Sequence, residues 1–398
     1  MHVLTSPRHA VVAGSGPGGA AAALLLARSG CAVTVLERVA APTAVGGGLL
    51  LQPNGIAVLQ GLGLGEVPGA HHLRSSTVRD GAGRVLLAVA TSGPEGLDHN
   101  LVVRRSALFG ALHDLLAADP RIDVRLGHAA EELVPGGVRV TTPSGSIELA
   151  ADLVVAADGA RSALRPAISP DARLVEGPTY VRALVPGGDA DDDAAGEWWT
   201  DLGLFGTAPL GDGTTYVFSS TAHPDLAAAV DAGDVTALAR RWGAELPIAG
   251  ELLGRVGGAD GLIVGRADEV HAPRWVTDRA ALLGDAAHAM LPNAGQGANS
   301  ALLDAAVLAL ELGDAPSIAA GLARYETRRR GPVGIVQADA RRLARLAHLR
   351  SGPARRARDV ALRAVARLPA ERHARRLLQE DPAAIRAALG ALAPAPNR

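Results

Sequence analysis

Several residue types are scarce or absent in this 398-residue chain, and each absence narrows what the chain can be. Cys31 is the single cysteine, which excludes an intramolecular disulfide framework and favours a reducing compartment. Lysine is absent, so all 39 lysine-or-arginine positions are arginine, a bias typical of a GC-rich genome. The formal charge of −2 offers no basic field for nucleic acid or an anionic membrane.

Long apolar runs are also missing. No run approaches the roughly 18 apolar residues of a membrane-spanning helix. The apolar stretch 11–27 is interrupted by five glycines and prolines, and cleavage there as a signal peptide would destroy a glycine turn. We therefore expect a cytoplasmic protein with no integral membrane segment and no metal site, acting as a monomer or homodimer.

A strand–turn–helix–strand pattern opens the chain. Residues 8–13 have the pattern of a buried strand, 18–29 of a helix and 31–37 of a second strand. The glycine-rich turn GSGPGG joins the first strand to the helix. This order is typical of a βαβ unit and predicts a parallel sheet.

The turn carries the spacing of a dinucleotide-binding fingerprint. Gly14 permits the tight turn, Gly16 lets backbone approach a pyrophosphate, and Gly19 lets helix and strand pack closely. The helix N-terminus adds unpaired N–H groups and partial positive charge. Glu37 ends the second strand, where it would accept hydrogen bonds from ribose hydroxyls and disfavour a ribose 2′-phosphate.

Two later motifs follow the first in a fixed order. They are ADGARSALR at 157–165 and GDAAHAMLPNAGQGAN at 284–299. Together with GSGPGG and Glu37, they resemble the single-component, group A flavoprotein aromatic hydroxylases, which are para-hydroxybenzoate hydroxylase-like. The resemblance spans about residues 8–330. VVRRSAL, with Arg105, fits the same family, and GGGLLLQPNG resembles its salicylate- and urate-hydroxylase-like branch.

This resemblance implies a tightly but non-covalently bound FAD, with NADH or NADPH as co-substrate. The implied reaction places one oxygen atom of O2 on an electron-rich aromatic or heteroaromatic ring through a flavin C4a-hydroperoxide. Because no second glycine fingerprint follows residue 37, NAD(P)H should bind only transiently. A small aromatic substrate and O2 are the expected partners, with no nucleic acid.

The resemblance also assigns cofactor-binding residues. Asp285 would hydrogen-bond the ribityl hydroxyls, Arg105 would reach the phosphate or ribityl region, and Asp158 would lie near the pyrophosphate and the passing nicotinamide. A helix starting near residue 298 would point its positive end at the flavin. The full expected set is Gly14, Gly16, Pro17, Gly18, Gly19, Glu37, Arg38, Gly47, Gly48, Arg105, Asp158, Gly159, Asp285, Pro292, Gly295, Gln296, Gly297, Ala298 and Asn299.

The implied architecture is an α/β fold. It combines a Rossmann-like FAD-binding domain with an inserted mixed or antiparallel-sheet substrate domain and C-terminal helices. The expected division is FAD-binding segments 1–72, 105–171 and 271–330, substrate-domain segments 73–104 and 172–270, and a helical region 331–398.

Substrate recognition is expected on the inserted sheet. Tyr216 is the candidate for orienting or deprotonating a phenol or heteroaryl N–H, Arg182 matches an arginine of the related branch, and Pro292 would sit where oxygen and substrate meet. Adjacent Trp198 and Trp199 must face opposite sides of a strand. The expected substrate residues are Trp198, Phe205, Thr207 and Tyr216, and the uncharged residues 206–208 indicate a neutral, apolar aromatic substrate.

Other functions remain as alternatives. A flavin-dependent halogenase is excluded because its lysine and Trp-x-Trp motif are missing, and a disulfide reductase because Cys31 has no partner cysteine. A flavin-dependent epoxidase or a decarboxylative hydroxylase stays open, as does a non-catalytic flavin-binding escort protein.

Overall fold

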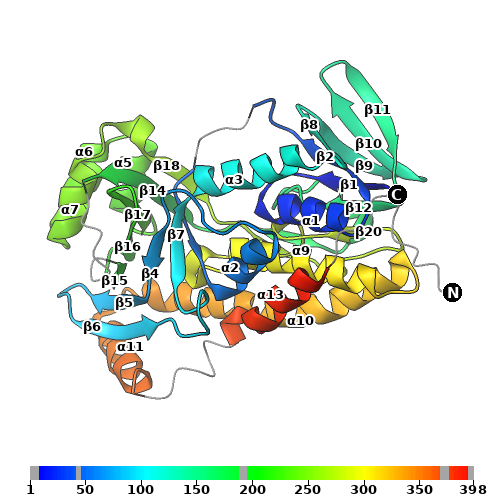
Figure 1. The fold of residues 1–398 in the computed structure, drawn as a ribbon. Coiled ribbons are helices and arrows are strands. Elements are labelled where there is room, and N and C mark those ends of the chain that lie inside the picture. Colours follow the sequence, from blue (N-terminus) through cyan, green and yellow to red (C-terminus); the bar gives the residue numbers. More distant parts are fainter. Residues whose placement is uncertain (1–8, 42–45, 188–194, 368–375, 393–398) are drawn as a thin grey trace.

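A computed structural model describes residues 9–41, 46–187, 195–367 and 376–392. A five-stranded parallel sheet, in the order β20-β12-β1-β2-β8, forms one end of the molecule (Figure 1). Its strands are β1 (His9–Ala13), β2 (Ala32–Glu37), β8 (Ile122–Leu126), β12 (Leu153–Ala156) and β20 (Ala280–Leu282). Valine and alanine dominate these short strands, as expected where both faces of a parallel sheet are covered.

Helices pack against this sheet and against one another. α1 contacts α9, which in turn contacts α10 and α2, while α13 covers α2. Their bounds are α1 (Pro17–Arg28), α2 (Pro53–Gly61), α3 (Arg105–Ala118), α4 (Arg165–Ile168), α8 (Asp285–His288), α9 (Gly297–Gly313), α10 (Ile318–Ala347), α11 (Gly352–Val365) and α13 (Pro382–Ala391). None of the helices in the described ranges is long and apolar enough to cross a membrane.

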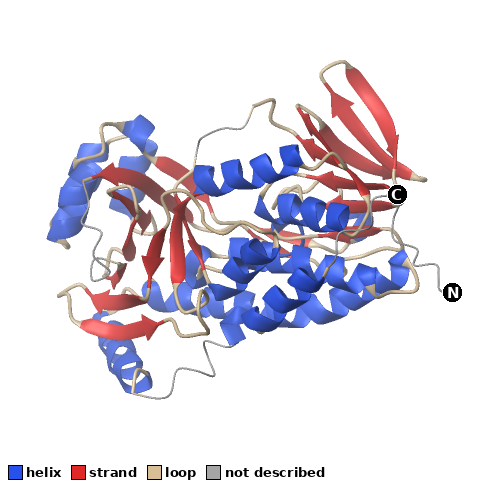
Figure 2. Ribbon diagram, in the orientation of Figure 1, coloured by secondary structure: helices blue, strands red, loops and turns tan. Residues whose placement is uncertain are grey.

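A seven-stranded mixed sheet lies at the opposite end of the molecule, in the order β18-β14-β17-β16-β15-β5-β6 (Figures 1 and 2). Its strands are β5 (Ser75–Asp80), β6 (Val85–Ala90), β14 (Thr179–Pro186), β15 (Gly196–Trp199), β16 (Leu204–Pro209), β17 (Thr214–Ser220) and β18 (Ile263–Arg266). Only β15 and β5 pair in parallel; the other neighbours are antiparallel.

Three small sheets complete the fold. The first joins β3 (Gly48–Leu51), β7 (Asn100–Arg104) and β4 (His71–Leu73). The second is the antiparallel meander of β9 (Ala129–Val134), β10 (Gly137–Thr142) and β11 (Gly145–Ala150). The third pairs β13 (Arg173–Val175) with β19 (Glu269–His271).

Two details of the expected domain division need correction. Within the segment 73–104, β7 pairs with β3 rather than with the seven-stranded sheet, because Leu101–Arg104 face Gly48–Leu51 across an antiparallel ladder. The expected boundary between 330 and 331 falls inside α10, which continues without a break from Ile318 to Ala347.

The segment 172–270 contains three helices that the alternating pattern did not predict: α5 (Pro224–Asp231), α6 (Val235–Gly243) and α7 (Pro247–Gly254). They bury Leu226, Leu238 and Trp242 against one face of the seven-stranded sheet. Local signals for them exist, because α5 and α7 begin with proline and the Asp234 carboxylate caps α6.

Candidate functional site

The glycine turn after β1 combines two tightly packed glycines with one that faces open space. Gly14 has φ +96°, and a Cβ there would lie 2.4 Å from the Ala157 carbonyl oxygen. A Cβ on Gly19 would lie 2.1 Å from the carbonyl oxygen of Gly14, whereas one on Gly16 would meet no atom within 4 Å. Because α1 begins at Pro17 without a side-chain cap, its first N–H groups can bind a pyrophosphate beside Gly16.

Glu37 at the end of β2 is held next to this turn. Its Oε2 accepts hydrogen bonds from the Ser15 amide (3.0 Å) and hydroxyl (2.8 Å), and its Oε1 accepts one from the Val39 amide (3.1 Å). Burial alone would raise the pKa of Glu37, but these hydrogen bonds outweigh it and lower the pKa. The carboxylate is therefore ionised and can accept ribose hydroxyls, whereas neighbouring Arg38 is exposed.

The 157–165 motif lies against the same turn, because β12 pairs in parallel with β1. Gly159 has φ +84°, and a Cβ there would meet nothing within 4 Å. Asp158 accepts the Ala163 amide at 2.9 Å, and burial raises its pKa. The aspartate thus holds the loop shape while Gly159 leaves room beside the turn.

Asp285 follows β20 and opens α8. It lies deep in the molecule, and burial raises its pKa against the opposing charges of His288 and Arg105. Its side chain nevertheless keeps an exposed surface, so it faces an open space within the fold. In the described part of the chain no group hydrogen-bonds this carboxylate. A carboxylate in such surroundings requires polar partners, which the ribityl hydroxyls of a bound FAD would supply.

The loop from Pro292 to Asn299 is shaped by buried amide side chains. Asn299 Nδ2 donates to the carbonyls of Leu50 (3.0 Å) and Gly295 (2.7 Å), and its Oδ1 accepts the Gln52 amide (2.9 Å). Gln296 Nε2 donates to Gln52 Oε1 (2.7 Å). Both side chains are therefore used within the protein, and only their backbone can serve a cofactor.

The accessible surface of this loop consists of backbone atoms and Pro292. Gly295 has φ +62°, Pro292 is exposed, and a Cβ on Gly297 would meet nothing within 4 Å. α9 starts at Gly297 without a side-chain cap, so its N–H groups, including that of Ala298, form a positive helix end. The start of α9 lies within one residue of the expected helix start near residue 298.

The glycines at 46–48 pack closely against two protein side chains. A Cβ on either residue would lie 2.6 Å from the Tyr216 ring, and one on Gly46 would lie 2.8 Å from Arg105 Cβ. Their small size therefore makes room for the Tyr216 ring and the Arg105 side chain.

Tyr216 and Arg182 lie on one face of the seven-stranded sheet, and three expected substrate residues lie on the other. Trp198 and Phe205 pack under α5–α7 with Trp242, so they are separated from Tyr216 by the sheet. Thr207 shares their face because side chains alternate along β16. We therefore correct the assignment of Trp198, Phe205 and Thr207 as substrate residues.

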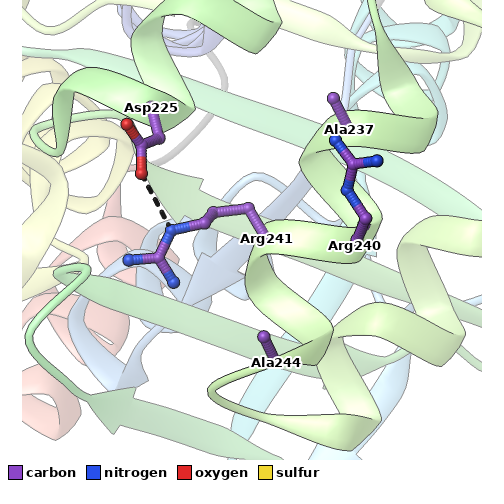
Figure 3. A pocket seen from close by; sticks show the side chains of 5 residues that line it. All are labelled: Asp225, Ala237, Arg240, Arg241 and Ala244. Carbon is purple, nitrogen blue, oxygen red and sulfur yellow. Dashed lines mark hydrogen bonds and ion pairs between the residues drawn. The ribbon is translucent and has the colours of Figure 1, made fainter.

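A surface pocket on α5 and α6 is separate from the site described above. It encloses about 370 Å³ and is lined by Asp225, Ala237, Arg240, Arg241 and Ala244 (Figure 3). Arg241 Nε donates to Asp225 Oδ2 at 3.1 Å, so part of its charge is already paired. These helices cover the sheet face opposite Tyr216.

The arrangement matches known proteins. The family model described as "FAD binding domain" matches residues 8–185 and 264–336, more than half of the chain. The chain belongs to the FAD-dependent monooxygenases. It is 33% identical over 370 residues to 3-amino-4-hydroxybenzoate 2-monooxygenase of Streptomyces cremeus, covering 89% of this chain and 91% of the relative. It is 32% identical over 330 residues to aurachin C monooxygenase/isomerase of Stigmatella aurantiaca, covering 79% and 83%.

Solved structures agree with the fold of this monooxygenase. Klebsiella pneumoniae HpxO complexed with FAD and uric acid has a TM-score of 0.79 and 25% identity, with 96% of each chain covered. 2-Methyl-3-hydroxypyridine-5-carboxylic acid oxygenase, in its tetrameric form, has a TM-score of 0.75 and 26% identity, covering 87% of this chain and 93% of that one. The expected family, fold class and FAD cofactor are confirmed.

A further acidic residue of the monooxygenase, which the sequence motifs did not indicate, lies near Tyr216. Glu197 on β15 lies on the same sheet face as Tyr216 and Arg182, although residues 206–208 indicated an uncharged surface. A signal was present, because GEWW places a lone acid within an otherwise apolar strand. Its face could not be known before the strand pairing was known.

Gly16→Val is expected to weaken FAD binding by the monooxygenase while leaving the apoprotein folded. A Cβ at this position would meet no atom within 4 Å beyond its chain neighbours, so the added side chain would extend into the space expected for the pyrophosphate. Thermal unfolding of the apoprotein and fluorescence titration with FAD measure the two effects separately. Gly14→Ala is the matched comparison and should lower the unfolding temperature, because φ +96° and the Ala157 oxygen oppose any side chain. An unchanged FAD affinity in Gly16→Val would place the pyrophosphate elsewhere.

Proposed function

We propose that this monooxygenase uses NADH or NADPH and O2 to hydroxylate an electron-rich aromatic or heteroaromatic small molecule. The substrate would lie between the Tyr216 face of the seven-stranded sheet and the loop at Pro292. The aromatic compounds named for the relatives, an aminohydroxybenzoate and uric acid, support this substrate class. The single cysteine supports a reducing, cytoplasmic location, and we propose a monomer or homodimer.

The position of Arg105 gives this proposal its main support, because its charge acts both on the cofactor side and on the substrate face. Its guanidinium opposes the effect of burial on the pKa of Asp285, and it does the same for Tyr216. The carboxylate suited to the ribityl chain and the phenol suited to the substrate therefore lie around one arginine. Bound FAD would supply hydride acceptance from NAD(P)H and activation of O2 at this place.

The protein side chains here orient and polarise the substrate. Burial raises the pKa of Tyr216, with Arg182 and Arg105 opposing, so its phenol stays protonated at neutral pH. Tyr216 would thus donate a hydrogen bond rather than remove a proton. Arg182, whose guanidinium lies 5.8 Å from the Tyr180 ring centroid, remains cationic and would bind an acceptor oxygen of the substrate.

A substrate screen tests the proposal. FAD is first quantified after denaturing release, and NADH or NADPH oxidation is then followed with hydroxylated benzoates, pyridines and quinolones. A true substrate should raise NAD(P)H oxidation by at least about tenfold, roughly 1.4 kcal/mol of barrier. The product should carry one added oxygen atom by mass spectrometry. Stable FAD binding without any oxygenated product across the panel would instead favour a flavin-binding escort protein.

A further inference from the structure

The accessible part of the Tyr216 face forms a small patch on an otherwise buried sheet surface. Along β14, β17 and β15, Arg182, Tyr216, Phe218 and Glu197 keep partial exposure. Their immediate neighbours on the opposite face, such as Val217, are buried against α5–α7. Partial exposure so deep in the molecule indicates that these side chains border an internal space, which is where the proposed function places the substrate.

One row of this patch crosses four strands. Across neighbouring strands, Arg182 lies opposite Phe218, Phe218 opposite Gly206, and Gly206 opposite Glu197. A Cβ on Gly206 would lie 2.2 Å from the Phe218 ring, so this ring covers Gly206. Three strand spacings of about 4.8 Å separate the ends, about 14 Å between the Arg182 and Glu197 backbones. The row therefore has an apolar middle, a cation at one end and a carboxyl at the other.

The Glu197 carboxyl is stabilised by few polar contacts among the described residues. Trp199 Nε1 donates to its Oε2 at 2.8 Å, and no arginine forms an ion pair with it within the described ranges. Burial raises the pKa of Glu197 to about 7, against the smaller opposing effect of Trp199. A carboxyl that titrates near neutral pH suits proton transfer better than Tyr216, whose phenol stays protonated.

Resting on the proposed function, we propose that Glu197 is the general base that accepts the proton of an O–H or N–H group on the aromatic substrate. The substrate O–H or N–H bond breaks, its electron pair stays on the substrate and enriches the ring, and the proton bonds to a Glu197 carboxylate oxygen. The proton then leaves to solvent. Substrates should thus carry a donor toward Glu197 and an acceptor toward Arg182, with the ring over Phe218.

Several other charged or titratable groups lie around Glu197. Burial raises the pKa of Tyr180, whose hydroxyl donates to Asn293 Oδ1 at 3.0 Å, and the nearby Glu197 carboxyl adds to this rise. Arg182 and Arg358, the latter stacked over Trp199, stay cationic. The remaining groups on adjacent elements are Tyr216 on β17, Asp80 on β5, which pairs with Arg84 and Arg363, and His348 at the end of α10.

The first test measures titration of Glu197 in the folded protein without any substrate. A carboxyl whose pKa is raised in the folded state lowers the free energy of unfolding as the pH rises from its unfolded pKa of about 4.3 to its folded pKa of about 7. Glu197→Gln should therefore unfold at a higher temperature than the wild type at pH 8, and this difference should shrink as the pH falls and disappear near pH 4. Glu251→Gln, an exposed carboxyl on α7, is the matched control and should show no such pH dependence. Equal wild-type and Glu197→Gln unfolding temperatures at pH 8 would overturn the proposal.

The second test uses the holoenzyme and a phenolic substrate from the screen. Glu197→Gln should lower kcat by about 100-fold with little change in KM, and the rise of kcat through about pH 7 should disappear. Substrates whose hydroxyl is already ionised at the assay pH should lose much less. Trp199→Phe, which keeps the carboxyl but removes its donor, should shift the wild-type pH profile upward.

The outcomes separate this proposal from the function on which it rests. If the wild type hydroxylates a phenol and Glu197→Gln does so at the same rate and with the same pH profile, Glu197 is not the base. An equal loss for ionised and un-ionised phenols likewise assigns Glu197 a structural role only. If the wild type oxygenates no aromatic compound, the proposed function fails, and the proton acceptor assignment fails with it whatever the unfolding data show.

Discussion

Asp304→Asn is expected to lower the free energy of unfolding by about 3–5 kcal/mol, because it leaves a buried arginine without its counter-charge. Asp304 on α9 is fully buried and contacts three groups. Its Oδ1 accepts Arg329 Nε at 2.8 Å, while its Oδ2 accepts the Gly284 amide at 3.0 Å and lies 2.5 Å from His288 Nε2. Arg329 is also fully buried, and its NH1 has no hydrogen-bond partner in the described part of the chain.

The pH dependence of this effect has a definite sign. Burial alone would raise the pKa of Asp304, but His288 and Arg329 outweigh it and lower the pKa. A depressed folded-state pKa contributes stability above the unfolded value of about 3.9, and that stability is lost as the pH falls through the folded value. The difference between wild type and Asp304→Asn should therefore be full at neutral pH and shrink below about pH 4.

Denaturant unfolding of the apoprotein, followed by circular dichroism, measures this loss. Asp314→Asn is the matched control, since that carboxylate is 98% exposed and lies 3.9 Å from Arg324. Its change should stay within about 0.5 kcal/mol. A loss below about 1 kcal/mol in Asp304→Asn would show that Arg329 finds another partner or stays hydrated.

The same cluster explains why His288 is not available for acid–base chemistry. Its ring is fully buried, and Nε2 is engaged with Asp304. Through the Gly284 amide, Asp304 also fixes the turn that presents Asp285. The histidine of the 284–299 motif therefore supports the geometry of the loop.

Local signals predicted the cofactor side of the molecule well. The strand, glycine turn and helix at residues 8–29 appear as β1 and α1, within one residue of the expected bounds. This success has a physical cause. Gly14 and Gly19 are required by close backbone contacts, and Glu37 by hydrogen bonds to a residue of the same turn, so spacing along the chain determines the geometry.

The substrate side could not be predicted in the same way. Side chains alternate between the two faces of a strand, so Trp198 and Trp199 must lie on opposite faces of the sheet. This alternation does not tell which of the two faces meets the cofactor. That choice depends on α5–α7, which cover the Trp198 face and which the sequence interpretation missed. The row from Arg182 to Glu197 depends on pairing between strands far apart in sequence, so the charged ends of the patch appear only in the folded chain.

Asp285→Ala is expected to weaken FAD binding by about 1.5–3 kcal/mol, roughly 10- to 150-fold in Kd, because it removes a charge-assisted hydrogen bond to the ribityl chain. The carboxylate faces open space with no hydrogen-bonding partner among the described residues, so few contacts within the protein should be lost. Asp285→Asn keeps one acceptor oxygen in place and should give an intermediate loss. Quenching of FAD fluorescence on addition of apoprotein measures all three affinities.

The stability of the apoprotein should change in the opposite direction. Burial raises the folded-state pKa of Asp285 despite the opposing charges of His288 and Arg105, so its ionisation destabilises the apoprotein as the pH rises above the unfolded value of about 3.9. Asp285→Asn apoprotein should therefore unfold at a higher temperature than wild-type apoprotein at pH 7, and at the same temperature near pH 4. Adding FAD should reverse the order at pH 7, because the wild type gains more from the ligand. If Asp285→Ala binds FAD as tightly as the wild type, another group holds the ribityl chain and Asp285 is left with no role in cofactor binding.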